Sequence, residues 1–398
     1  MNILFIGAFG TDYLKQQLGS NLQSLYNSSE FLIKGFKKIK DINFKTITSP
    51  DITSYPIGPL YVKSYDDKKE DIKIVSSLNI SLVKQLWTII AMVADAKRII
   101  RKNEGITTVI IPYMVFRHVF ASRLLKILFN KRVKICTIIP DIFFPKKNNL
   151  HNTFIYCVNK WTEKMARKSD CFVLYTEAMA DFLKIKSKPY IIMEGVIDPE
   201  ILDHGKINFT NYTHKKIITY SGSLNIKYGI IRLLDAVRLI EDSTIELHLL
   251  GQGDAEDIIY EYIGKDNRIK FLGMLSKEKT YIEQMNSTML INPRNQNDGE
   301  FTKYSFPSKN IEYLLTGKPT ILTKLPGMPE DYYPYFIDAK DGSPEALAEA
   351  INKVLEMSEE ERIIFGKNAR CFILDNKNCY LQSKRIYELI KSIDIVDQ

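Results

Sequence analysis

The chain has 398 residues, and the 45% that are hydrophobic can fill two cores at the usual size of ~150 residues per domain. Its five cysteines show no Cys-x-x-Cys spacing, which argues against the disulfide framework of a small secreted protein and predicts reduced thiols in the cytoplasm. No run reaches the ~18 apolar residues that span a bilayer. Residues 1–7 predict a strand rather than a signal peptide, because they lack a basic leader and a small-residue cleavage site.

The charge is divided unevenly along the chain. Residues 1–200 hold 30 Lys and Arg against 18 Asp and Glu, a net charge of +12, and the remainder hold 25 against 29, a net charge of −4. This asymmetry favours an anionic partner for the first half, either nucleic acid or a membrane surface, with a solvated basic face as the alternative. No base-reading or stacking element accompanies the charge, so we predict no nucleic-acid partner.

Strand and helix patterns alternate through the first half, which predicts a mostly parallel sheet covered on both faces. The prolines and charges between residues 50 and 73 predict a loop. We expect strands at 2–8, 44–48, 109–112, 133–140, 171–175 and 190–193, and helices at 22–39, 82–100, from about 116, and 152–167.

Aromatic and basic residues gather around the helices of this half. Trp87, Phe116, Phe120 and Phe129 lie near several Lys and Arg side chains in the sequence, a pattern that suits anionic lipid headgroups. Packing of these aromatic rings in the core is the alternative. We therefore consider a cytoplasmic protein that makes peripheral contact with the inner face of an anionic membrane.

Asp141 and His118 are candidate cleft residues of the first half. Asp141 follows the strand at 133–140, and His118 lies near the start of the helix from about residue 116. Ligands of open α/β sheets gather outside the carboxyl ends of strands, which favours both positions. The alternatives are a turn or N-cap acid for Asp141 and a helix-surface residue for His118.

The second half begins after a polar segment without periodicity, residues 195–214, where we place the domain boundary. A strand from residue 217 then turns through Gly222 into a helix from about residue 230. By itself this pattern is typical of an ordinary β-to-α turn. Further strands are expected at 244–250 and 269–272, and further helices at 276–285, 343–357, 359–372 and 378–392.

Residues 289–322 predict a strand, a loop, a helix and another strand. Pro307 suits the first turn of the helix, and Gly317 suits its left-handed end. The amino end of such a helix attracts phosphate, and Lys309 in its first turn adds a positive charge. Glu312 lies about one turn further, where its carboxylate can accept hydrogen bonds from hydroxyl groups. Phosphate beside a diol indicates a nucleotide sugar, and a surface helix with an ordinary Lys and Glu is the alternative.

The run Ser305-Phe-Pro-Ser-Lys-Asn-Ile-Glu312-Tyr-Leu-Leu-Thr-Gly-Lys-Pro-Thr-Ile321 resembles the donor-site segment of retaining glycosyltransferases of family 4, common in bacterial surface-polysaccharide synthesis. The resemblance implies that Glu312 holds the donor ribose. Tyr304 stands where the family usually has the first Glu of a pair, and Glu300 is the nearest acid.

Residues 222–229 are similar to the family's Gly-x-Leu-x-x-x-x-Gly loop, in which backbone approaches the donor diphosphate. Lys227 would neutralise the diphosphate, and Ser223 stands where the family commonly has Arg. Arg294 is a further candidate contact, or else an ordinary surface arginine. The expected donor-binding residues are Gly222, Ser223, Lys227, Arg294, Tyr304, Ser305, Phe306, Pro307, Ser308, Lys309 and Glu312.

The same resemblance implies an α/β GT-B fold, with two Rossmann-like domains whose parallel sheets face each other across a cleft. Residues 1–195 would bind the acceptor, residues 215–375 would bind the nucleotide sugar, and a helix within 376–398 would return to the first domain.

The implied reaction moves a sugar, with retention, from a nucleoside diphosphate to a hydroxyl of a glycan or lipid-linked glycan. Asp141, His118 and Lys227 are its candidate catalytic residues. No acidic pair is placed to chelate a cation, so we predict that no metal or other cofactor is required. A nucleotide-sugar epimerase and a catalytically silent partner subunit of the same fold are the alternatives. A dehydrogenase is disfavoured, because no Gly-x-Gly-x-x-Gly follows the first strand.

Overall fold

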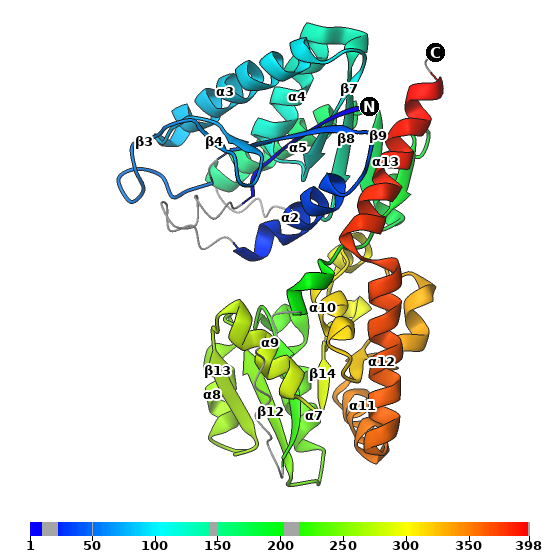
Figure 1. Cartoon of the computed structure of the whole chain (residues 1–398). Coiled ribbons are helices and arrows are strands. Elements are labelled where there is room, and N and C mark those ends of the chain that lie inside the picture. The colour runs from blue at the N-terminus through cyan, green and yellow to red at the C-terminus, as the bar shows by residue number, and fades with distance from the viewer. Residues whose placement is uncertain (10–22, 50, 143–149, 203–214, 397–398) are drawn as a thin grey trace. The chain divides into compact units, whose positions relative to one another are not determined.

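Parallel β-sheets form the centre of both structural units of the chain (Figure 1). The computed structural model describes residues 1–9, 23–49, 51–142, 150–202 and 215–396. Unit 1 comprises residues 1–196 and 379–398, and unit 2 comprises residues 197–378. The α/β class with parallel sheets in two domains is confirmed. The predicted boundary segment 195–214 lies partly outside the described residues, and the roles assigned to the two domains stay predictions.

Unit 1 contains, in its described part, an eight-stranded sheet in the order β10-β9-β8-β7-β1-β2-β5-β4. Every pairing is parallel except that of the edge strand β4 with β5. The strands of the unit are β1 (Asn2–Gly7), β2 (Asn43–Thr48), β3 (Tyr61–Val62), β4 (Tyr65–Asp67), β5 (Ile72–Ile74), β6 (Ser77–Leu78), β7 (Thr107–Pro112), β8 (Val133–Ile139), β9 (Cys171–Leu174) and β10 (Tyr190–Ile192). Its helices are α2 (Gln23–Lys37), α3 (Ser81–Lys102), α4 (Phe116–Phe129), α5 (Leu150–Ala166), α6 (Ala178–Phe182) and α13 (Cys379–Val396).

The sequence predicted a loop between residues 50 and 73. This prediction is wrong for the second half of the segment, which forms strands. β5 extends the main sheet beside β2, and β4 pairs with it in antiparallel register, with Lys73 and Asp66 joined by a 2.9 Å ion pair. Strands of two or three residues are too short to show the alternation of apolar and polar side chains that identifies a strand in a sequence. The charged segment between residues 66 and 73 therefore forms an edge of the sheet that the sequence pattern does not indicate.

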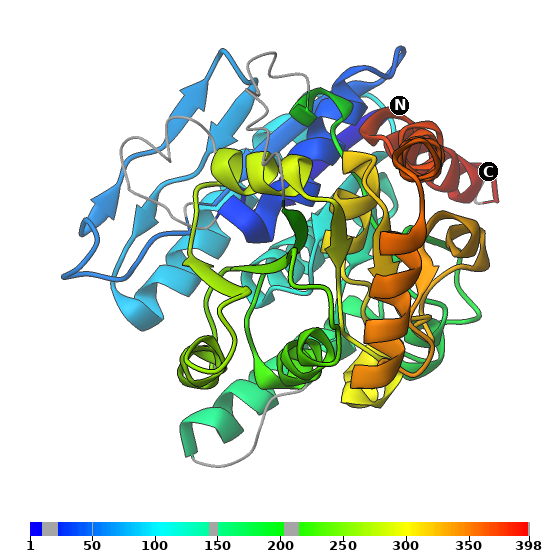
Figure 2. The same cartoon turned by 90° about the horizontal axis from the view of Figure 1, so that it is seen from below.

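The carboxyl-terminal helix α13 completes unit 1. It lies beside α2 in both views of the chain (Figures 1 and 2). Ser383 donates a hydrogen bond to the carbonyl oxygen of Leu32 at 3.0 Å, and the amide of Gln382 donates to that of Gly195, also at 3.0 Å. Lys134, near the start of β8, donates to the carbonyl oxygen of Ile393. Residues distant in sequence therefore share one folded unit.

Unit 2 has, in its described part, a six-stranded parallel sheet in the order β13-β12-β11-β14-β15-β16. The strands are β11 (Lys216–Ser221), β12 (Ile245–Leu250), β13 (Ile269–Gly273), β14 (Met289–Ile291), β15 (Thr320–Leu322) and β16 (Ile337–Asp338). The helices are α7 (Ile230–Arg238), α8 (Glu256–Ile263), α9 (Lys277–Asn286), α10 (Ser308–Thr316), α11 (Pro344–Glu356) and α12 (Glu359–Asn376).

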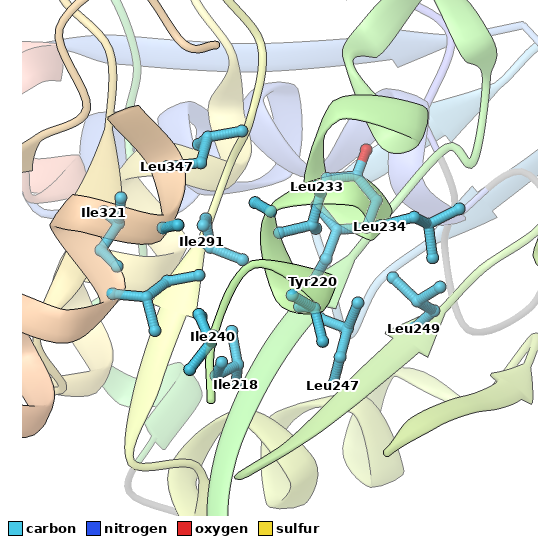
Figure 3. Packing of buried hydrophobic residues seen from close by; sticks show 14 of the residues in the cluster. Ile218, Tyr220, Leu233, Leu234, Ile240, Leu247, Leu249, Ile291, Ile321 and Leu347 are labelled. Atoms are coloured by element: carbon cyan, nitrogen blue, oxygen red, sulfur yellow. The ribbon is translucent and has the colours of Figure 1, made fainter. Parts of the chain in front are cut away.

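The core of unit 2 is formed by side chains from its central strands and from α7 and α11. Leu233 and Leu234 of α7 and Leu347 of α11 are fully buried against strand residues such as Ile218 (Figure 3). Burial of apolar surface stabilises a fold by about 25 cal/mol per Å². This packing therefore holds in place the strand ends that carry the loops described below. Among the described helices, none is both long and apolar enough to cross a bilayer.

Candidate functional site

The order of strands in unit 2 reverses direction between β11 and β14, which predicts a crevice there. The chain leaves β11 through α7 toward β12 on one side, and it leaves β14 through α10 toward β15 on the other. Loops that diverge from neighbouring parallel strands leave a crevice at their carboxyl ends, where open α/β sheets bind ligands. The two loops at this point are residues 222–229 and 292–307, which contain most of the expected donor-binding residues.

Helix α10 begins at Ser308, one residue after Pro307. Pro307 is its N-cap rather than part of its first turn, because its ψ of 110° is extended. Gly317 ends the helix with a φ of 75°, in the left-handed conformation that the sequence predicted. Lys309 therefore lies in the first turn, where the unpaired backbone N–H groups of the helix attract an anion.

Two buried hydrogen-bond systems fix α10 against the sheet. The hydroxyl of Tyr313 accepts from the backbone N–H of Ser221 at 2.7 Å and donates to its carbonyl oxygen at 3.0 Å. Asn292, just after β14, donates to Asn310 at 2.7 Å. Since these bonds join α10 to the ends of both β11 and β14, the first turn of the helix is held at the crevice.

The glycine loop approaches Lys309 so closely that it excludes a side chain. Gly222 has a φ of 145°, and a Cβ atom there would lie 2.4 Å from Nζ of Lys309. A Cβ atom on Gly251, in the next loop, would lie 1.8 Å from the carbonyl oxygen of Gly222. Glycine is needed at Gly222 because of its positive φ and at Gly251 because the backbone of Gly222 occupies the space.

Tyr220 is a residue of the site that the sequence analysis missed. Its ring is fully buried among apolar side chains, and its hydroxyl points away from them (Figure 3). That hydroxyl donates to the carbonyl oxygen of Ser223 at 2.7 Å and accepts from Nζ of Lys309 at 2.7 Å. Tyr220 thus positions both the glycine loop and the lysine. The signal in the sequence was a tyrosine near the end of the strand that leads into the glycine loop.

Burial changes the proton affinity of the two charged residues of α10. It lowers the pKa of Lys309 to about 7, together with the charge of Arg294, while Glu312 acts in the opposite direction. Burial also raises the pKa of Glu312, against the effect of Lys277 and Lys309. Burial therefore shifts both groups toward their neutral forms, and an anion that approaches Lys309 will favour its protonation.

This pKa predicts that donor affinity falls as the pH rises above 7. Below about pH 7 Lys309 is protonated and ready for a diphosphate; above it, binding must first protonate the amine, because the bound anion raises its pKa. We expect the uptake of nearly one proton per diphosphate bound at pH 8. Calorimetry in two buffers with different ionisation enthalpies measures this uptake, and an equal heat in both buffers would contradict the assignment.

Arg294 and Lys227 lie on the same pair of aromatic rings. Lys227 is 4.9 Å from the centre of the Tyr228 ring, and Arg294 is 4.6 Å from that of Phe301. The two rings contact each other edge to face at 6.1 Å. Cations over aromatic faces are held in place while keeping their charge, so both remain suited to an anionic ligand. No pattern in the sequence points to Tyr228 or Phe301.

The long loop after β14 is fixed by buried polar contacts. Arg232 of α7 forms a 2.7 Å ion pair with Asp298, whose side chain is 3% exposed. Arg294 donates to the hydroxyl of Ser305, which is buried together with Phe306. Tyr304 is partly exposed at the end of a short 3-10 helix, Glu300–Tyr304, and Ser223 and Ser308 are exposed. Direct contact of these residues with a donor stays a prediction, as does the absence of a metal requirement.

Asp141 lines a separate cavity in unit 1, of about 190 Å³. The cavity lies at the carboxyl ends of β7 and β8 and against α5, with Tyr113, Met114 and Tyr156 among its lining residues. The Asp141 side chain is exposed and accepts a hydrogen bond from the N–H of Ile142 at 2.9 Å. A carboxylate beside apolar and aromatic side chains is an arrangement suited to a small hydroxylated ligand.

His118 is buried rather than exposed on the surface of α4, so the helix-surface interpretation is wrong. Its side chain is 1% exposed, and its Nε2 shares a 3.0 Å hydrogen bond with the hydroxyl of Ser49. Burial and the neighbouring Arg117 lower its pKa well below the usual value, which favours the neutral ring. His118 is also not among the residues that line the Asp141 cavity. A catalytic role for His118 stays a prediction.

Residues 206–372, most of unit 2, match the family model described as Glycosyl transferases group 1. No curated protein matches the chain. The matched segment includes the glycine loop, the loop after β14 and α10, so the candidate site lies within a glycosyltransferase domain.

Solved structures share the fold of the whole chain at low sequence identity. HepE from Anabaena, solved in complex with UDP, has a TM-score of 0.65 and 14% identity, with 98% of this chain and 100% of that chain covered. The α,α-trehalose 6-phosphate synthase from Burkholderia multivorans has a TM-score of 0.65 and 8% identity, with 100% and 97% covered. The lipopolysaccharide outer core galactosyltransferase WaaB has a TM-score of 0.62 and 14% identity, with 98% and 99% covered.

The three neighbours share two-domain α/β architecture with this chain over nearly its full length, and the family match places the glycosyltransferase domain in unit 2. The chain therefore has the two-domain GT-B fold, and its residues 206–372 match a glycosyltransferase family.

Proposed function

We propose that the chain transfers a sugar from a nucleoside diphosphate to a hydroxyl group of a glycan or lipid-linked glycan acceptor. The observation that carries this proposal is the position of Lys309. Its ammonium group lies in the first turn of α10, against the backbone of Gly222 and on the hydroxyl of Tyr220. A helix amino end, a glycine loop and a lysine with a lowered pKa together suit a diphosphate.

The charges of the site match the demands of the reaction. Negative charge builds on the diphosphate as its bond to the sugar breaks, and fixed positive groups stabilise it best. Lys309, Lys227 and the amino end of α10 supply those groups from unit 2. The solved complex of HepE with UDP-glucose supports uridine diphosphate sugars as the first donors to test.

Glu312 is the proposed contact of the donor ribose, one turn beyond Lys309. We expect Glu312→Ala to weaken binding of a nucleoside diphosphate by at least ~1 kcal/mol, the scale of one hydrogen bond to a charged group. Binding of inorganic pyrophosphate, which has no ribose, should remain unchanged. Calorimetry with both ligands separates the two effects, and an equal loss for both would show that Glu312 does not act through the ribose.

The finer parts of the function are also proposals. We assign retention of configuration, without a firm protein nucleophile, and a role in cell-surface polysaccharide synthesis on the resemblance of the donor segment. Asp141 would contact the acceptor from unit 1, since it lines the cavity there. We place the protein in the cytoplasm, in peripheral contact with the inner face of the membrane.

A panel of nucleotide sugars tests the proposal directly. One donor should raise the melting temperature of the protein and release free sugar slowly in the absence of acceptor, because water can replace the acceptor hydroxyl. Lys309→Met should weaken both signals at the same donor concentration. Formation of an epimerised nucleotide sugar without any acceptor, or stabilisation without release of sugar under any condition, would argue against a transferase.

A further inference from the structure

Helix α3 exposes an uncharged apolar stripe on unit 1. Leu86 and Ile90 are 61% and 69% exposed, and Trp87 between them is 40% exposed. Residues at spacings of three and four lie on the same face of a helix, so these side chains form one continuous surface. Val83 adds a further exposed apolar side chain one turn earlier.

The opposite face of α3 is also apolar. Ile89, Met92 and Ile100 are buried in the core of unit 1. A helix at the surface of a protein usually carries polar residues on the face away from the core. The outer face of the first half of α3 carries exposed apolar side chains instead of polar ones. This pattern favours contact of that face with an apolar partner.

A neighbouring segment extends this stripe. Ile57 and Leu60 are 86% and 46% exposed, and the Tyr61 ring meets the Trp87 ring edge to face at 6.3 Å. Hydrogen bonds hold the segment there: Leu60 accepts from the N–H of Asn79 at 2.7 Å, and the Trp87 indole donates to Ser76 at 3.2 Å. The blue segment around β3 lies beside α3 in Figure 1.

We propose that this apolar surface, formed by Ile57, Leu60, Tyr61, Leu86, Trp87 and Ile90, inserts into the headgroup region of an anionic phospholipid bilayer. The proposal rests on the membrane contact within the proposed function, and it names the side chains that make it. Its test uses lipid alone, so its failure would leave the proposed transfer reaction untouched.

The composition and charge of unit 1 favour lipid as the occupant. Tyr and Trp rings are suited to the boundary between headgroups and acyl chains, and Leu and Ile enter below them. Lys63 is exposed two residues after Tyr61, and residues 1–200 carry a net charge of +12, which complements anionic headgroups.

The surface differs from the one considered from the sequence. Phe116, Phe120 and Phe129 pack against the core of unit 1, and the first two contact the Trp161 ring at 5.6 and 5.7 Å. Of the four aromatic residues considered there, Trp87 lies on the apolar surface. Insertion of apolar side chains, rather than charge alone, should therefore dominate the attachment.

Tryptophan fluorescence tests the insertion, because the chain has two tryptophans. Trp161→Phe leaves Trp87 as the only reporter, and Trp87→Phe leaves Trp161. With vesicles of equal parts phosphatidylglycerol and phosphatidylcholine, the first protein should show a blue shift and quenching by brominated acyl chains. The second should show neither. The reverse pattern, or no change in either protein, would overturn the proposal.

Co-sedimentation with the same vesicles measures the energy of the contact. The double variant Leu86→Gln/Ile90→Gln should bind at least about tenfold more weakly, because two exposed apolar side chains no longer enter the lipid. The matched control Ile363→Gln/Ile364→Gln changes two equally exposed residues of α12 in unit 2 and should bind normally.

Three results would contradict insertion. Unchanged binding of the Leu86/Ile90 variant, with complete release by salt, would mean that charge alone holds the protein on lipid. An equal loss in both double variants would mean that the surface has no special role. Self-association without vesicles that the Leu86/Ile90 variant abolishes would identify a second copy of the chain as the occupant.

Discussion

Replacing Lys309 by methionine will weaken binding of the nucleoside diphosphate sugar by roughly 10- to 100-fold, the range expected when a charged hydrogen-bond donor is removed. Methionine matches the lysine side chain as far as Cε, so the substitution removes the ammonium group, which lies 4.1 Å from the centre of the Tyr220 ring, and keeps most of the apolar stem. Inorganic pyrophosphate should lose affinity to the same extent, because Lys309 is assigned to the diphosphate. Calorimetry with both ligands at pH 6.5 to about 7 measures the effect in the protonated range of the lysine.

Lys367 provides the matched control. It is exposed on α12, away from the crevice between β11 and β14, and Lys367→Met changes the net charge of the protein by the same amount. Its donor affinity should equal that of the unchanged protein. If Lys309→Met also binds donor normally, the diphosphate does not lie at the amino end of α10, and the proposed site is wrong.

Gly222→Ala is expected to impair both donor binding and stability. Its Cβ atom would lie 2.4 Å from Nζ of Lys309, and its φ of 145° is one that alanine rarely adopts. Backbone strain of this kind costs about 1–3 kcal/mol, which thermal and denaturant unfolding will detect. Because the methyl group also displaces the ammonium group, donor affinity should fall by a factor approaching that of Lys309→Met.

A variant of a second glycine distinguishes the effect of backbone strain from the effect of displacing the ammonium group of Lys309. Gly105, in unit 1, also has a positive φ, of 75°, but a Cβ atom there meets nothing within 4 Å. Gly105→Ala should therefore lower stability while leaving donor affinity unchanged. In the double variant Gly222→Ala/Lys309→Met the losses of affinity should not add, since both act through one ammonium group. Additive losses would mean that Gly222 contributes to the donor site independently of Lys309.

The sequence predicted best the elements whose structure depends on residues that are close together in the chain. Proline before a helix, glycine at its end and apolar strands on either side are local signals, and they located α10 to within two residues. The loop predicted for residues 50–73 failed for the complementary reason. The strands β4 and β5 exist because they pair with each other and with β2, and a three-residue strand has no pattern of its own.

The sequence by itself determined the α/β class, the order of most strands and helices, and the presence of Lys309 and Glu312 one turn apart on one helix. Only the tertiary structure decided which residues meet them. Tyr220 precedes Lys309 by 89 positions, yet the two side chains are joined by a 2.7 Å hydrogen bond. The outward face of α3 was likewise undetermined, because both of its sides are apolar and only packing shows which of them is buried. Periodicity reports what a helix can bury, whereas contacts between distant segments decide what it does bury.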